Sequence, residues 1–195
     1  MLDKLKAEVC EANHALVAHG LVTLTWGNVS AIDREAGDDE GGSGGDGGGG
    51  GGLVAIKPSG VAYDQLTPDT IVIVDLNGNV VEGDLRPSSD TPTHVALYRA
   101  FSGIGGITHT HSPFATAFAQ ARLPIDCLGT THADHFHGPV PVTRPLSPEE
   151  LDAGYEHYTA TAIIERLAEL DPIAAAAVLL AGHAPFAWGP TAAKS

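Results

Sequence analysis

The chain has 195 residues, with 24 acidic and 10 basic side chains and a formal charge of −14 when histidine is counted as neutral. Such an acidic chain repels phosphate backbones, so we expect no nucleic-acid partner. The longest apolar stretch, 173–181, is far shorter than the roughly 20 residues that span a bilayer, and no secretory signal opens the sequence, so we expect no membrane association. The two cysteines, Cys10 and Cys127, are too few for a disulfide scaffold and indicate a cytoplasmic protein.

The first third of the chain predicts one helix followed by strands. Apolar residues at three- and four-residue steps predict a helix that begins near Leu2, with Gly20 placed to cap its C-terminus. An Asn-Gly-Asn turn at 77–79 predicts a hairpin. We expect strands over residues 21–26, 29–33, 53–57, 71–75 and 80–82. The strand 53–57 is expected to pair with the strand 29–33.

Residues 37–52 are mostly glycine with a few interspersed acidic residues. Glycine loses the most backbone entropy on ordering, and almost nothing apolar in this segment offsets that loss. We predict a flexible, acidic, glycine-rich loop inserted into the domain, with a functional tether as the alternative.

The rest of the chain intermixes helices and strands. Helices are expected to start at Thr91-Pro92 and at Ser112-Pro113. A capping box that begins with Ser147 predicts a third helix, which extends to about Leu170. Strands are expected over residues 106–110, 140–142, 175–181 and 185–189. With 43% hydrophobic residues, the chain can build one core. We therefore predict a single domain over residues 1–195, of the α/β (α+β) class, with a central, largely antiparallel sheet flanked by helices.

The most specific chemical signal is His109-Thr110-His111 in the predicted strand 106–110 and just after it. Residues i and i+2 of a strand point to one face, so both imidazoles can reach one ion. His183, at the end of a later predicted strand, is the natural third ligand of a zinc site with an open position for substrate. The alternative is a pair of strand histidines that face solvent.

Three short turns rich in small residues and hydroxyl groups form a second signal. Such turns, at strand ends or helix starts, can bind the phosphate of a monoester through backbone N–H groups. Ser88 and Ser89 precede the helix at Thr91, where the helix dipole favours an anion. Each turn taken alone could be an ordinary turn or helix cap. The three turns are Trp26-Gly27-Asn28, Lys57-Pro58-Ser59-Gly60 and Ser88-Ser89-Asp90.

A third polar run, from Thr130 to Gly138, places Asp134 among histidines and hydroxyl groups. A carboxylate in such a setting can act as a general acid–base or can orient a metal-bound histidine. The alternative is a polar loop in which Asp134 only caps a turn.

Together these runs resemble the L-ribulose-5-phosphate 4-epimerase family, within the class II aldolase/epimerase superfamily. The resemblance extends from Met1 to about Gly189, interrupted by the glycine-rich segment. It is carried, in this order, by Thr25-Trp26-Gly27-Asn28-Val29-Ser30, Lys57-Pro58-Ser59-Gly60-Val61, Pro87-Ser88-Ser89-Asp90-Thr91-Pro92-Thr93-His94, Gly105-Gly106-Ile107-Thr108-His109-Thr110-His111-Ser112, Gly129-Thr130-Thr131-His132-Ala133-Asp134 and His183-Ala184-Pro185-Phe186-Ala187-Trp188-Gly189.

The resemblance implies roles for individual residues. His109, His111 and His183 would bind one zinc ion per subunit, with Asp90 as a further ligand or close neighbour. Asp134 would be the acid–base on one face of the sugar. Residues that hold the substrate, mainly its phosphate, would be Gly27, Asn28, Ser59, Gly60, Ser88 and Ser89. Related fuculose-phosphate aldolases carry glutamate at the position of Asp90, so aspartate favours an epimerase.

The resemblance also implies a reaction and a setting. L-Ribulose 5-phosphate would become D-xylulose 5-phosphate by retro-aldol cleavage of C3–C4 and recondensation, joining L-arabinose or related pentose breakdown to the pentose phosphate pathway. Family members assemble as homotetramers. The first alternative is a class II aldolase of the fuculose-phosphate type. The second is a remnant that binds zinc and sugar phosphate with little turnover. The third is that the histidines are structural and bind no metal.

The family's second acid–base group is a tyrosine beyond a long C-terminal helix. The sequence ends at Ser195 before such a segment, and no tyrosine of this chain matches that place: not Tyr63, Tyr98, Tyr155 or Tyr158. We therefore expect a chain that lacks the family's C-terminal helix, binds zinc and phosphate, and epimerises weakly.

Overall fold

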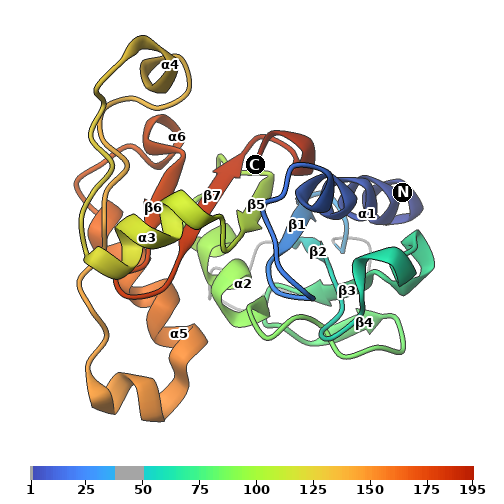
Figure 1. Cartoon of the computed structure of the whole chain (residues 1–195). Coiled ribbons are helices and arrows are strands. Elements are labelled where there is room, and N and C mark those ends of the chain that lie inside the picture. Colours follow the sequence, from blue (N-terminus) through green and yellow to red (C-terminus); the bar gives the residue numbers. More distant parts are fainter. Residues whose placement is uncertain (1, 38–50) are drawn as a thin grey trace.

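A seven-stranded sheet forms the centre of the computed structural model, which describes residues 2–37 and 51–195 (Figure 1). Most of the predicted loop 37–52 therefore lies outside the described residues. The strand order is β4-β3-β2-β1-β5-β7-β6, and every neighbouring pair is antiparallel, which confirms the predicted fold class. The strands are β1 (Asn28–Asp33), β2 (Leu53–Ile56), β3 (Val72–Asp75), β4 (Val80–Glu82), β5 (Gly106–His109), β6 (Ala177–Leu179) and β7 (Pro185–Gly189).

Helices cover both faces of this sheet because its central strands bury alternate residues on opposite sides. The helix α1 (Leu2–Ala18) covers one face, and α2 (Thr91–Ala100) and α5 (Pro148–Leu167) pack together on the other (Figure 1). The residues that face α1 include Ala31, Ala55 and Ile73. Those on the side of α2 and α5 include Ile32, Val54 and Val74. No helix within 2–37 and 51–195 is long and apolar enough to cross a membrane.

Two strand predictions were wrong and one was too long. Residues 21–26 form turns, because Leu24 takes a left-handed conformation (φ 55°) and the N–H of Trp26 donates to the carbonyl of Thr23. Residues 140–142 make only isolated bridges, at Val140 and Val142. The strand predicted over 175–181 is shorter in the structure, where it forms β6. Asp171 caps a short helix, α6 (Pro172–Ala175), and this helix includes Ala175, the first residue of the predicted strand.

The remaining helices lie beside the sheet. The α3 helix (Pro113–Ala121) starts at Ser112 as predicted, and the run from Thr130 contains a four-residue helix, α4 (Thr130–Ala133), where a loop was the alternative. Figure 1 shows α4 projecting away from the sheet. Three-residue 3₁₀ helices cover 63–65, 68–70 and 192–194.

The α5 helix begins as the sequence predicted and contains a kink that it did not predict. The Oγ of Ser147 accepts from the N–H of Glu150, and the Glu150 carboxylate accepts from the N–H of Ser147. Gly154 then takes φ 155° and ψ 82°, a conformation that L side chains rarely adopt. Arg144 donates to Glu150 before the kink and to Glu165 after it, at 2.7 Å in each case. The guanidinium thus holds both parts of the helix.

The final turn of the chain packs directly on bare backbone of the sheet. A Cβ added to Gly106 would collide with the carbonyl of Thr191, and one added to Gly189 would collide with the carbonyl of Lys194. The hydroxyl groups of Thr108 and Ser195 hydrogen-bond at 2.6 Å across the same contact. Glycine is therefore required at both positions for this turn to close over β5 and β7.

Arg34 caps the C-terminal end of α2. Its guanidinium donates to the carbonyls of Tyr98, Phe101 and Ile104, each at 3.1 Å. Helix ends leave such carbonyls without partners in the helix, and a nearby cation satisfies them.

We expect Arg34→Ala to lower the free energy of unfolding by about 1–3 kcal/mol, because three carbonyls lose a charged donor. Urea denaturation measures this change. Arg86→Ala is the matched control, since Arg86 is exposed and its side chain makes no hydrogen bond among the described residues, and an equal loss in both variants would contradict the capping role.

Candidate metal centre and anion pocket

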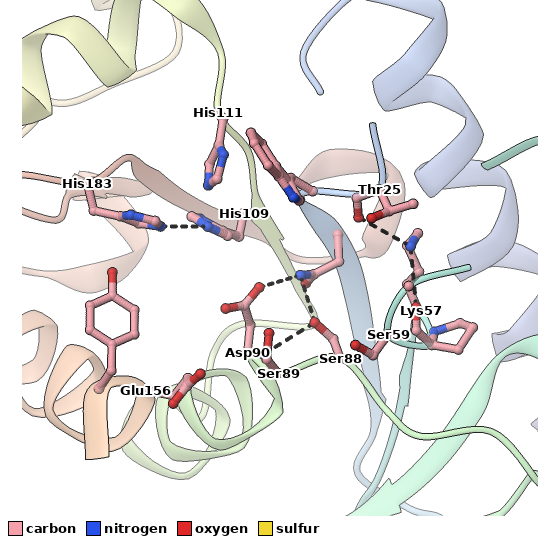
Figure 2. Close-up of a pocket in the computed structure, with 16 residues that line it drawn as sticks. Thr25, Lys57, Ser59, Ser88, Ser89, Asp90, His109, His111, Glu156 and His183 are labelled. Atoms are coloured by element: carbon pink, nitrogen blue, oxygen red, sulfur yellow. Dashed lines mark hydrogen bonds between the residues drawn. The ribbon is translucent and has the colours of Figure 1, made fainter. Parts of the chain in front are cut away.

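Three histidines converge where β5 ends and its antiparallel neighbours β1 and β7 begin. Asn28 of β1 pairs with His109 of β5, and His109 pairs with Phe186 of β7. His183 lies in the turn before β7, and each of the three imidazoles offers a nitrogen within 4.8 Å of the other two (Figure 2). The strand ends at His109, so His111 reaches the cluster from the segment that follows and not from the strand itself.

His109 anchors this cluster. Its ring is buried and stacks on Phe186, with centroids 4.2 Å apart. Its Nδ1–H donates to the carbonyl of Pro185 at 2.9 Å, since that oxygen can only accept. The proton is therefore on Nδ1, and the lone pair on Nε2 faces the Nε2 of His183, which is 3.3 Å away.

All three histidines are held in the neutral form that binds metals. Burial lowers the pKa of both His109 and His111 below the usual range, and the negative charge of Asp90 offsets part of this effect. Burial, together with the two neighbouring imidazoles, lowers the pKa of His183 to about 4. Three neutral imidazoles whose nitrogens meet at one point suit a divalent cation such as zinc, with a position left open.

Asp90 lies beside the histidines and is held by Asn28. The Nδ2 of Asn28 donates to the Asp90 carboxylate at 2.7 Å and to the Oγ of Ser88 at 3.1 Å. Figure 2 shows Asp90 between His109 and Ser88. It is not one of the three residues that form the cluster, so its role as a metal ligand remains a prediction.

Two of the predicted anion-binding turns face each other. The N–H of Ser59 donates to the carbonyl of Arg86 at 2.9 Å, and the N–H of Ser88 donates to the carbonyl of Lys57 at 3.1 Å. These two N–H groups are therefore already paired. Within the described part of the chain, the hydroxyl groups of Ser59 and Ser89 have no partner and are available to a ligand.

Lys57 supplies a full positive charge that the sequence interpretation did not assign. The side chain is 2% exposed, and its ammonium group donates to the carbonyl of Val61 at 2.8 Å and lies 4.8 Å from the ring centroid of Tyr63. No carboxylate pairs with it in residues 2–37 and 51–195. Burial lowers its pKa, since a buried charge loses hydration. An anion in the pocket would restore a counter-charge.

These groups line one cavity of about 260 Å³. Its lining includes the predicted residues Gly27, Asn28, Ser59, Gly60, Ser88, Ser89, Asp90, His109, His111 and His183. Further lining residues that the sequence interpretation did not assign include Lys57, Tyr155 and Glu156. Lys57 could have been suspected, because it is one of few cations and precedes the Pro-Ser-Gly turn. No signal marked Tyr155 and Glu156 except the glycine before them.

Asp134 is the one predicted site residue outside this cavity. It follows α4, where the N–H of Asp134 donates to the carbonyl of Thr130. The neighbouring His132 hydrogen-bonds through Nε2 to the carbonyl of Gly138 at 2.7 Å, which orders the loop. The acid–base role of Asp134 remains a prediction.

Removing one imidazole should abolish tight metal binding. We expect His183→Ala to weaken zinc binding by roughly 100-fold or more, since even residues that only orient a ligand contribute 10- to 100-fold. Metal analysis and titration of the apoprotein with zinc measure this. His19→Ala, at an exposed position on the end of α1, is the control. Unchanged affinity in His183→Ala would contradict the three-histidine site.

Acid should destabilise the folded protein through His94. This fully buried ring hydrogen-bonds through Nδ1 to the Oγ of Ser30 at 2.7 Å, and burial lowers its pKa to about 4. Below pH 6.5 the unfolded chain binds a proton at this site that the folded protein does not. Through His94 alone, the free energy of unfolding should therefore fall by about 3 kcal/mol as pH drops from 6.5 to 4. Urea denaturation of the metal-free protein across this range measures the fall, which should be smaller in His94→Gln.

The chain is similar to known proteins along nearly its whole length. A family described as Class II Aldolase and Adducin N-terminal domain matches residues 7–195. The L-ribulose-5-phosphate 4-epimerase UlaF of Salmonella paratyphi C (strain RKS4594) is 52% identical over 188 residues, which cover 96% of this chain and 76% of that protein.

Two solved structures share the fold. An L-fuculose 1-phosphate aldolase superposes with a TM-score of 0.74 at 29% identity, covering 98% of this chain and 78% of its own. The L-fuculose-1-phosphate aldolase from Thermus thermophilus gives a TM-score of 0.67 at 26% identity, with 98% and 82% covered. The match along nearly the whole sequence and the shared fold lead to one conclusion: the chain belongs to the class II aldolase and adducin N-terminal domain family.

Proposed function

We propose that this protein is a zinc-dependent epimerase that interconverts L-ribulose 5-phosphate and D-xylulose 5-phosphate. The observation that carries the proposal is one cavity that joins three metal-binding imidazoles to two hydroxyl-bearing turns and a buried lysine. The 52% identity to a protein named for this reaction supports the same substrate.

The phosphate of the substrate binds at the end of the cavity formed by the two turns. The free hydroxyl groups of Ser59 and Ser89 donate to its oxygens, and the ammonium group of Lys57 neutralises its charge. Since the Lys57 hydrogens already point to carbonyls, this lysine acts through its charge. The N-terminus of α2 adds its dipole. An acidic protein can thus bind an anion locally.

The ketose carbons lie toward the histidines. A zinc ion bound there would stabilise, as a Lewis acid, the negative charge that develops on the ketose oxygens. His109 keeps its Nε2 aimed at this point through its bond to Pro185, and Asn28 holds Asp90 beside it. These contacts fix the ligands before substrate arrives, which limits reorganisation during the reaction.

Inversion at C4 requires that the C3–C4 bond break and re-form, because the C4 hydrogen is not acidic. A base takes the proton of the C4 hydroxyl, the C4–O group becomes an aldehyde, and the C3–C4 electron pair passes into a three-carbon enediolate. Glycolaldehyde phosphate, anchored by its phosphate, rotates and presents its other face. The enediolate then attacks, and the new C4 oxygen takes up a proton. Asp134 is proposed for one of the two proton transfers.

Asp134 can serve this role in an assembly of several copies. It lies outside the cavity of its own chain, on the loop that follows the projecting α4 helix (Figure 1). Two apolar side chains are strongly exposed: Leu128, just before α4, at 91%, and Phe114, at the start of α3, at 87%. We expect a homotetramer in which these residues are covered and Asp134 approaches the cavity of a neighbouring copy. The free thiols of Cys10 and Cys127 suit the cytoplasmic location expected from the sequence.

The second candidate is an aldolase that releases both fragments. The structural similarity to an L-fuculose 1-phosphate aldolase at 29% identity favours it. The two functions differ in product: the epimerase yields D-xylulose 5-phosphate, and the aldolase yields free glycolaldehyde phosphate and dihydroxyacetone from L-ribulose 5-phosphate.

We expect the zinc-loaded protein to convert L-ribulose 5-phosphate to D-xylulose 5-phosphate, followed by NMR or a coupled assay. Ser89→Ala should lower kcat/KM about 10- to 100-fold, mainly by raising KM, since it removes a donor to a charged phosphate. Ser102→Ala, at an exposed position away from the cavity, is the control. Accumulation of glycolaldehyde phosphate without xylulose product would establish the aldolase instead.

A further inference from the structure

The cavity has a second end that the proposed function leaves unused. Tyr155 and Glu156 of α5 line it together with the histidines and the serine turns. Figure 2 shows Glu156 and His183 on one side of the pocket and Lys57 and Ser59 on the opposite side. The end near α5 therefore combines a carboxylate with a phenol, and the other end carries the positive charge.

The kink in α5 is what brings these two residues to the cavity. Gly154 precedes them directly, and its φ of 155° breaks the helix at this point. Arg144 holds the two parts of the helix, and the hydroxyl of Thr93 on α2 donates to the carbonyl of Glu156 at 2.7 Å. The backbone of residues 155–156 is thus fixed from three sides, as a binding surface requires.

Tyr155 is oriented by the metal cluster itself. Its ring is half-buried and packs edge-on against His183, with centroids 5.7 Å apart and the planes at 75°. A tyrosine phenol carries its proton at neutral pH and can donate it in a hydrogen bond. The Tyr155 side chain therefore offers a neutral donor beside the three imidazoles.

We infer that Tyr155 and Glu156 bind the C1 hydroxymethyl group of the ketose. The inference rests on the proposed function: with the C5 phosphate at the serine turns and C2 and C3 near the histidines, C1 extends toward α5. The Glu156 carboxylate accepts from the C1 hydroxyl, and the Tyr155 phenol donates to its oxygen. The carboxylate also repels phosphate, which prevents the substrate from binding in the reverse direction.

The experiment compares L-ribulose 5-phosphate with its 1-deoxy analogue, in which a methyl group replaces the hydroxymethyl group. The wild-type protein should prefer the hydroxylated substrate about 10- to 100-fold in kcat/KM, because the analogue leaves the two side chains without a partner. This preference should shrink to near unity in Glu156→Ala and fall in Tyr155→Phe. Glu169→Ala, an exposed glutamate beyond the end of α5, is the matched control and should keep the full preference.

A binding measurement separates this subsite from the proposed reaction. Saturation-transfer NMR on the zinc-loaded protein, with inorganic phosphate present, compares dihydroxyacetone with hydroxyacetone, which lacks one hydroxyl. The wild-type protein should bind dihydroxyacetone more tightly, and Glu156→Ala should bind both alike. Such a result in a protein that does not epimerise would refute the proposed function and support the subsite.

Three results would overturn the inference. The first is an active epimerase whose preference for the C1 hydroxyl is unchanged in Glu156→Ala and Tyr155→Phe. The second is equal binding of dihydroxyacetone and hydroxyacetone by the wild-type protein. The third is loss of zinc from Glu156→Ala, which would make this glutamate part of the metal site.

Discussion

The site depends on one part-buried hydrogen bond, from the imidazole of His109 to the carbonyl of Pro185. This bond sets the tautomer of His109 and stops the ring from turning, so its free nitrogen can face only toward His183. The carbonyl stays in place because β5 and β7 pair in a fixed register beside β1. A one-residue slip in either pairing would move His109 to the opposite face of the sheet. The strand register is therefore the framework on which metal binding is built.

Charge is organised locally in a chain with a large negative total. The cavity places Lys57 and the hydroxyl groups at one end and the carboxylate of Glu156 at the other. Much of the acidic excess lies elsewhere, on exposed surfaces and in the glycine-rich segment. Net charge excludes an extended basic surface for nucleic acid, but it does not describe what a small ligand meets in a pocket, where the nearest few groups and their burial dominate.

The sequence predicted the elements whose signals are local. The capping box at Ser147 marks the start of α5, and the closeness of His109 to His111 follows from their spacing in the chain. The kink at Gly154 was not predictable in the same way, because a single glycine in a helical pattern also occurs in straight helices. The bend is held by contacts with Arg144 and Thr93, which lie elsewhere in the chain. Asp134 shows the reverse case: the motif names a residue that the structure places outside the cavity, so its role stays a prediction.

Glycine at 106 and 189 is needed for contact with the last turn of the chain, since any side chain at either position would strike a backbone carbonyl. Directed evolution that randomises β5 and β7 to change the metal site would lose most of its library at these two codons. The damage would first show as a loosened C-terminus, before the imidazoles moved. An engineer should therefore leave both glycines fixed and diversify other positions around the pocket.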